Sequence, residues 1–195
     1  SLSVATARFR VRIQFALVSV LIFGSLFGST SLLYAASGTV HFLQDGDQQR
    51  FLSLEEALMA IGHGALPDDG TIYLSGGIHN GEIRLEHMQD LLFLPAEEGS
   101  APILAGDIYL VQSQQIAFRG LALESVIDIR DSENVTLIGT PHDDTLTVMM
   151  SGRAEGILVD GGSGNDTISI TQHDASGHTI VNGDDGNDRL LIDFN

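Results

Sequence analysis

Short stretches in which apolar and polar residues alternate dominate the chain from Thr71 onward. Examples are TIYLSG, PILAG, VIDIRD and NVTLIG, which are bounded by Gly, Pro, Asn, Asp or Ser. Alternation with a period of two predicts β-strands that bury one face, and the bounding residues predict tight turns. We therefore expect an all-β fold made of many short strands.

One segment has a helical period instead. In SLEEALMAIG, four apolar residues recur at helical spacing on one face: Leu54, Ala57, Leu58 and Ile61. Ser53 and Glu56 fit a capping box, and Gly62 can end the helix. The pattern predicts one helix near residues 53–61.

The strand-like stretches recur at a nearly constant interval. The residues that end one stretch per cycle lie 20, 25, 19, 22 and 22 positions apart: Ser75, Pro95, Gly120, Gly139, Gly161 and Gly183. Over the last two intervals the alignment holds residue by residue. Segments 137–158, 159–180 and 181–195 then superimpose. A repeat of this length indicates stacked coils, because one coil alone cannot bury its apolar face.

A 22-residue stack predicts columns of inward-facing residues. The columns are Leu146–Ile168–Leu190, Val148–Ile170–Ile192, Leu137–Val159–Val181 and Val135–Ile157–Thr179, with Thr145, Thr167 and Arg189 facing outward. The expected fold is a parallel β-solenoid, with the helix near 53–61 covering its first coil.

The N-terminal residues predict export. Arg8, Arg10 and Arg12 precede a long apolar run at 13–36 that is rich in Ser and Gly toward its end. A cleaved signal peptide over residues 1–37 is one interpretation, and an uncleaved membrane anchor at 13–36 is the other. Both place everything after residue 37 outside the cytoplasm.

The exported part is strongly acidic. All 26 acidic residues follow residue 37, where only six arginines and no lysine balance them, so the formal charge there is −20. Such a surface disfavours nucleic acid and attracts cations. The chain has no cysteine, which excludes disulfides and thiolate chemistry.

Three glycine- and aspartate-rich segments occupy equivalent positions in the repeats. GGSGNDTIS at 161–169 matches the calcium-binding nonapeptide G-G-x-G-x-D-x-U-x at every fixed position. GDDGNDRLL at 183–191 differs at Asp184, and GTPHDDTLT at 139–147 has Thr140 and His142 in place of glycines. Residues 139–191 therefore resemble the nonapeptide repeats of RTX proteins.

The residues themselves suit Ca²⁺, which prefers six to eight oxygen ligands from carboxylates and carbonyl groups. Stacking at the strand spacing of ~4.8 Å would bring Asp166 and Asp188 together, and a cation would relieve their repulsion. The RTX resemblance implies that adjacent loops share one ion. Its ligands would be the Asp166 and Asp188 carboxylates, with carbonyl groups near Gly162, Gly164, Asp184 and Gly186. A poorer site is expected between Asp144 and Asp166.

A metal-free alternative stays open. In it, Asn165 and Asn187 form a ladder at a solenoid corner and the aspartates cap turns. Each coil also has one nonapeptide rather than two, so any metal is expected on one edge only. His173 and His178, five residues apart without a third ligand, indicate a solvated loop rather than a metal site. Asp128 and Asp131 are expected to be solvated or in turns.

Residues 38–138 resemble, in texture, the right-handed parallel β-helix of pectate-lyase-like proteins. That resemblance raises an alternative function, a fragment of a polysaccharide lyase or epimerase, for which Arg84 or Arg119 would be the candidate base. The chain has no lysine to assist such a base, and about three irregular coils leave little room for a saccharide groove, so we expect no enzymatic activity.

The expected protein is a non-catalytic, exported calcium-binding solenoid of a cell surface or matrix. Its parts are the export segment at 1–37, an irregular β-helix at 38–138 and RTX-like repeats at 139–195. The repeats stop partway through a coil, so either more coils follow or the open end associates with another chain or larger assembly.

Overall fold

The computed structural model describes residues 39–194 of the chain. The predicted export segment at 1–37 lies outside these residues. Among residues 39–194, no helix has the length and apolar character needed to cross a bilayer.

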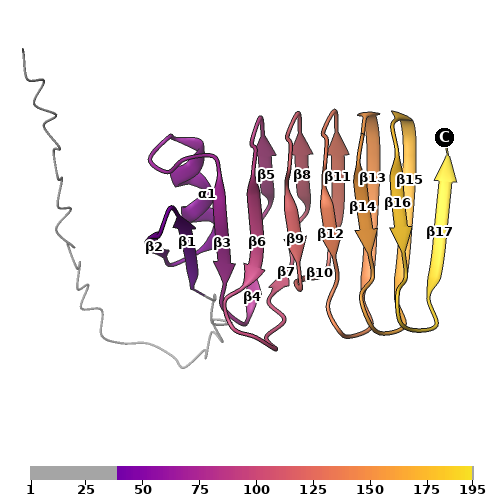
Figure 1. The fold of residues 1–195 in the computed structure, drawn as a ribbon, viewed down its shortest axis with the longest axis horizontal. Helices are drawn as coiled ribbons and strands as arrows, with labels where there is room; N and C mark the ends of the chain where they lie inside the picture. The colour runs from indigo at the N-terminus through magenta and orange to yellow at the C-terminus, as the bar shows by residue number, and fades with distance from the viewer. Residues whose placement is uncertain (1–38, 195) are drawn as a thin grey trace, which may run out of the picture. The chain divides into compact units, whose positions relative to one another are not determined.

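Residues 70–194 wind into six coils of parallel strands, stacked one on the next (Figure 1). One face is an eight-stranded sheet in the order β16-β14-β12-β9-β6-β3-β1-β2. Its strands are β1 (Val40–Gln44), β2 (Asp47–Phe51), β3 (Gly70–Leu74), β6 (Leu91–Pro95), β9 (Ala117–Arg119), β12 (Thr136–Ile138), β14 (Ile157–Asp160) and β16 (Thr179–Asn182). The predicted parallel β-solenoid is confirmed.

A second face is a six-stranded sheet in the order β17-β15-β13-β11-β8-β5. Its strands are β5 (Ile83–Glu86), β8 (Ile108–Val111), β11 (Val126–Arg130), β13 (Thr145–Arg153), β15 (Thr167–Ser176) and β17 (Arg189–Phe194). The first three coils add a short third face of β4 (Ile78–His79), β7 (Ile103–Leu104) and β10 (Ala122–Leu123). The solenoid is thus three-sided at first and two-sided after β11.

The predicted helix is α1 (Leu54–Gly62), and its N-cap is Ser53, whose hydroxyl accepts from the Glu56 N–H at 3.1 Å. The Glu56 carboxylate accepts from the Leu52 N–H at 2.9 Å, one residue earlier than a standard capping box. α1 buries Leu54, Ala57 and Ile61 and contacts the antiparallel β1–β2 hairpin.

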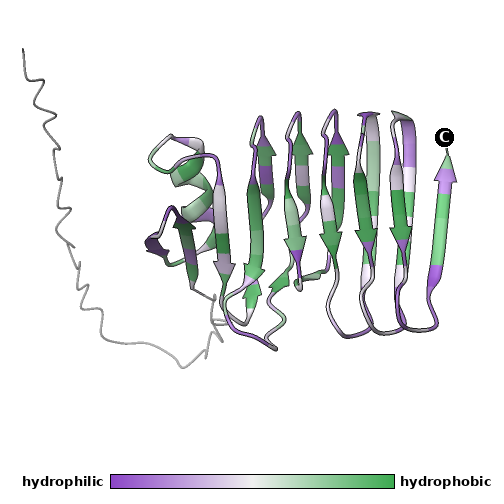
Figure 2. Cartoon of the chain, viewed as in Figure 1, coloured by the Kyte–Doolittle hydropathy of each residue, from purple (hydrophilic) through white to green (hydrophobic). Residues whose placement is uncertain are grey.

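The predicted columns are present. Leu146 pairs with Ile168 and Ile168 with Leu190, and the other columns follow the same 22-residue register. Apolar residues concentrate on the strands and polar residues at the turns (Figure 2). Leu146 and Ile168 are fully buried, whereas Leu190 is 46% exposed because no described coil lies beyond it.

One interval in the predicted repeat is wrong by one residue. Leu74 pairs with Pro95, so Ser75 is not equivalent to Pro95 and the first interval is 21 rather than 20. The irregular second interval of 25 is correct, since Phe93 pairs with Phe118. The difference arises because Ser75 lies in a turn, and turns vary in length between coils, whereas the paired strand residues keep their register.

The contribution of this core to the free energy of unfolding can be tested at the stacked phenyl rings of Phe93 and Phe118. Their centroids are 4.3 Å apart, and both side chains are fully buried. We expect Phe118→Ala to lower the free energy of unfolding by ~3–5 kcal/mol, because it removes a large side chain from a core that cannot collapse around the gap. Urea denaturation measures this loss. Met149→Ala, at a position 44% exposed, is the control and should cost less than about 1 kcal/mol.

Candidate metal centre

The three predicted loops lie on one edge of the solenoid, where each chain segment passes from the eight-stranded to the six-stranded sheet. They are residues 139–144 (loop 1), 161–166 (loop 2) and 183–188 (loop 3). Thr167 pairs with Thr145 and with Arg189, so the loops that precede these residues are stacked in register. The sixth-position aspartates Asp144, Asp166 and Asp188 therefore form a column.

Two of these aspartates, Asp166 and Asp188, bind the backbone of the preceding coil. Oδ1 of Asp166 accepts from the Asp144 N–H at 2.7 Å, and Oδ1 of Asp188 accepts from the Asp166 N–H at 2.9 Å. These charge-assisted hydrogen bonds join the coils at the corner, where the strands have ended. One oxygen of Asp166 and one oxygen of Asp188 thus connect neighbouring coils.

The second carboxylate oxygen lies against the first glycine of its own loop. A Cβ added at Gly161 would overlap Asp166 Oδ2, and one added at Gly183 would overlap Asp188 Oδ2. The first glycine of the motif is therefore required because the carboxylate occupies the space that a side chain would fill.

Asp166 differs from the other two aspartates in having a buried oxygen without a hydrogen-bond partner. Its side chain is 1% exposed, and Oδ2 is a buried polar atom without a hydrogen-bond partner among the described residues. Burial raises the pKa of Asp166, and the nearby charges of Asp144, Asp188 and Asp143 raise it further, while the Asp144 N–H lowers it. A buried carboxylate of this kind is costly unless a proton or a cation compensates it.

Loops 2 and 3 share a tight backbone. φ is +91° at Gly162 and +133° at Gly164, and it is +64° at Asp184 and +159° at Gly186. In both loops the second residue donates its N–H to an Asx side chain two residues earlier: Gly162 to Asp160 Oδ1 at 3.0 Å and Asp184 to Asn182 Oδ1 at 3.1 Å. The four residues whose carbonyl groups are predicted to bind calcium thus lie in two turns of similar conformation.

The ladder expected of a metal-free corner is also present. The Asn165 N–H donates to Asp143 Oδ1 at 2.8 Å, and the Asn187 N–H donates to Asn165 Oδ1 at 3.2 Å. The ladder extends to Asp143, which the sequence analysis did not include. It uses the exposed fifth positions and leaves Asp166 Oδ2 unsatisfied, so the ladder does not replace a ligand there.

Side chains alone do not assemble a metal site on this edge. No group of three or more His, Cys, Asp or Glu side chains in residues 39–194 is arranged to hold a metal ion. The donors available are one buried carboxylate oxygen with the neighbouring carboxylate and loop carbonyl groups. This oxygen-only set suits Ca²⁺, which accepts backbone carbonyl ligands, and does not suit metals that require nitrogen or sulfur.

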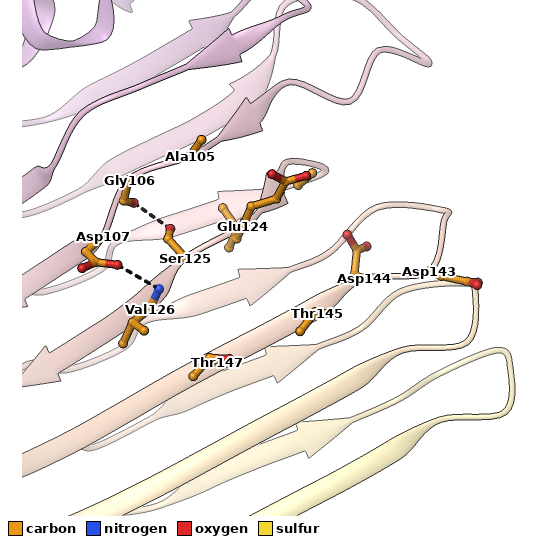
Figure 3. A pocket seen from close by; sticks show the side chains of 12 residues that line it. Ala105, Gly106, Asp107, Glu124, Ser125, Val126, Asp143, Asp144, Thr145 and Thr147 are labelled. Carbon is orange, nitrogen blue, oxygen red and sulfur yellow. Dashed lines mark hydrogen bonds between the residues drawn. The ribbon is translucent and has the colours of Figure 1, made fainter.

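A groove of about 840 Å³ lies beside loop 1 (Figure 3). It forms where the third sheet ends at β10, because the next coil passes from β12 to β13 without a strand on that side. Its walls include four acidic residues, Asp107, Glu124, Asp143 and Asp144. Oδ1 of Asp107 accepts from the Val126 N–H at 3.2 Å, and the Ser125 hydroxyl donates to the Gly106 carbonyl at 2.6 Å. The sequence contains no signal for this groove.

The structure does not bring the two candidate arginine bases together. Arg84 is on β5 of the six-stranded sheet, where it contacts Glu86 at 2.5 Å, and Arg119 is on β9 of the eight-stranded sheet. His178 Nδ1 lies 3.0 Å from Glu155, and His173 is exposed, so the two histidines share no site.

The expectation that Asp128 is solvated is wrong. Asp128 lies on β11 and is 8% exposed, and the guanidinium of Arg130 donates to both of its oxygens. This ion pair also raises the pKa of Arg130. Asp131 is in a turn as expected, where it accepts from the Arg153 N–H at 3.0 Å.

Comparison with protein-family models, with curated proteins and with solved structures gives no match to this chain. Its function must therefore be argued from the chemistry of its own residues.

The uncompensated charge of Asp166 leads to a prediction for the calcium-free protein. In EGTA at neutral pH, we expect Asp166→Asn to melt at a higher temperature than the wild type, since it removes the buried charge and keeps an oxygen for the Asp144 N–H. The folded-state pKa is raised, so the folded protein holds the proton more tightly than the unfolded chain. The wild type should therefore approach the variant in stability as the pH falls through the folded-state pKa. Calorimetry over a pH series measures the difference.

Asp174→Asn is the control for this comparison, because its carboxylate is 92% exposed. It should leave both the melting temperature and its pH dependence unchanged. A lower melting temperature for Asp166→Asn at every pH would mean that the protein already compensates the charge.

Proposed function

We propose that the chain is an exported, non-catalytic calcium-binding β-solenoid, a structural module of a cell surface or matrix. Calcium would lie at the edge formed by loops 2 and 3. The Asp166 and Asp188 carboxylates would hold it with carbonyl groups of residues 162, 164, 184 and 186. The ion's chemical contribution is positive charge and oxygen coordination between stacked coils.

The observation that carries this proposal is the buried, unpartnered Oδ2 of Asp166. Native proteins seldom leave a buried polar atom without a partner, and an ionised oxygen is the most costly kind. The atom lies beside Gly161 in a loop that has the full nonapeptide pattern. A divalent cation at this position would satisfy the oxygen and neutralise the repulsion from Asp188.

The charge of the chain supports an extracellular location for such a module. Residues 38–195 contain every acidic residue and only six of the nine arginines, so self-repulsion opposes folding until cations screen it. Extracellular calcium sites have dissociation constants of about 10⁻⁴–10⁻³ M, and millimolar calcium fills them. When the free calcium concentration is ten times the dissociation constant of the site, binding stabilises the folded state by ~1.4 kcal/mol. Calcium would thus favour folding after export.

The direct test is the thermal unfolding of the full chain in EGTA and in excess calcium. We expect calcium to raise the melting temperature by several degrees, and magnesium to have little effect, because Mg²⁺ prefers a rigid octahedral shell and retains its waters. The double variant Asp166→Asn with Asp188→Asn should lose the calcium response. Asp68→Asn, at an exposed loop position, should keep it.

Two results would contradict the proposal. An unchanged wild-type melting temperature would rule out calcium as a folding ligand. A full response in the double variant would place the site at other residues.

A further inference from the structure

The three stacked loops have two different conformations, although their sequences align in one 22-residue register. The second and fourth residues of loops 2 and 3 have positive φ, at Gly162, Gly164, Asp184 and Gly186. Neither Thr140 nor His142 in loop 1 does. Loop 1 is therefore a different kind of turn, and not an imperfect copy of the other two.

The residue directly before each loop accounts for the difference. Asp160 and Asn182 accept the N–H of the second loop residue and draw it away from the aspartate of the same loop. The equivalent residue in loop 1 is Ile138, which pairs with Asp160 and has no acceptor in its side chain. The Thr140 N–H is therefore available to Asp144.

Thr140 supplies loop 1 with the partners that Asp166 lacks. Its N–H donates to Asp144 Oδ2 at 2.6 Å, and its hydroxyl donates to the same oxygen at 2.8 Å. Thr140 is 3% exposed and Asp144 is 8% exposed, so both hydrogen bonds are shielded from water. Two donors to one carboxylate oxygen compensate its charge without a cation.

We propose that calcium acts as a local clamp at one junction of the stack, between loops 2 and 3, while Thr140 closes loop 1 without metal. This inference rests on the proposed calcium site and specifies what that site regulates. The Asp144 carboxylate is compensated with or without calcium, whereas the Asp166 carboxylate is compensated only when calcium binds. The protein then has one ion-dependent junction, between loops 2 and 3.

Hydrogen exchange of the full chain in EGTA and in calcium, read by mass spectrometry, tests the clamp. We expect calcium to slow exchange about tenfold in peptides covering 161–194, the factor for a site filled at ten times its dissociation constant. Exchange in peptides covering 71–130 should not change. Equal protection along 71–194 would overturn the local clamp but leave the calcium site standing. No protection anywhere would overturn both.

A second experiment tests the role of Thr140 with the double variant Ile138→Asn, Thr140→Gly, which copies the pattern of loops 2 and 3. We expect it to bind one more calcium ion per chain than the wild type, because Asp144 Oδ2 loses both donors. Equilibrium titration with a calcium indicator, or native mass spectrometry, counts the ions. Thr140→Ser keeps the hydroxyl and should bind the same number as the wild type.

Unchanged stoichiometry in a folded double variant, or an extra ion in Thr140→Ser, would overturn the role of Thr140. If the double variant does not fold, the exchange experiment on the wild type decides the proposal.

Discussion

Parallel pairing of each strand with its equivalent in the next coil is the constraint on which the rest of this structure depends. Because the register is 22 residues in the last coils, every side chain lies beside a residue of the same position in the repeat. Apolar residues in such columns produce a continuous core, with Leu146 and Ile168 fully buried. The same rule applied to charged residues produces a column of carboxylates.

Hydrogen bonds between neighbouring coils stabilise the carboxylate column. One oxygen of Asp166 and one of Asp188 accept from the backbone of the preceding coil, which turns a repulsive column into a connection between coils. The second oxygen of each carboxylate requires another hydrogen-bond donor or a cation. Thr140 provides it for Asp144, whereas no described residue provides it for Asp166. Loop 1 therefore satisfies its carboxylate with its own hydrogen bonds, whereas loop 2 has a carboxylate oxygen that suits a cation.

The change from three sheets to two also follows from the stacking. A third strand needs a counterpart in the next coil, and the segment from Gly139 to Asp144 forms a loop instead of one. β10 therefore ends its sheet, and the groove in Figure 3 opens beside it. Loop 1 is thus both the boundary of the regular repeats and one wall of the groove.

The sequence by itself determined the solenoid, the helix at Leu54–Gly62 and the column of Asp144, Asp166 and Asp188, because periodic patterns and cap residues act locally. It also contained the difference between Ile138 and Asp160, which a comparison of the aligned repeats can find. Only the tertiary structure decided which carboxylate oxygen has a partner, that Asp128 is shielded from water, and where the groove lies. Those properties depend on which atoms from neighbouring coils and strands lie within hydrogen-bond distance and exclude water. Residue types in a linear pattern do not specify that.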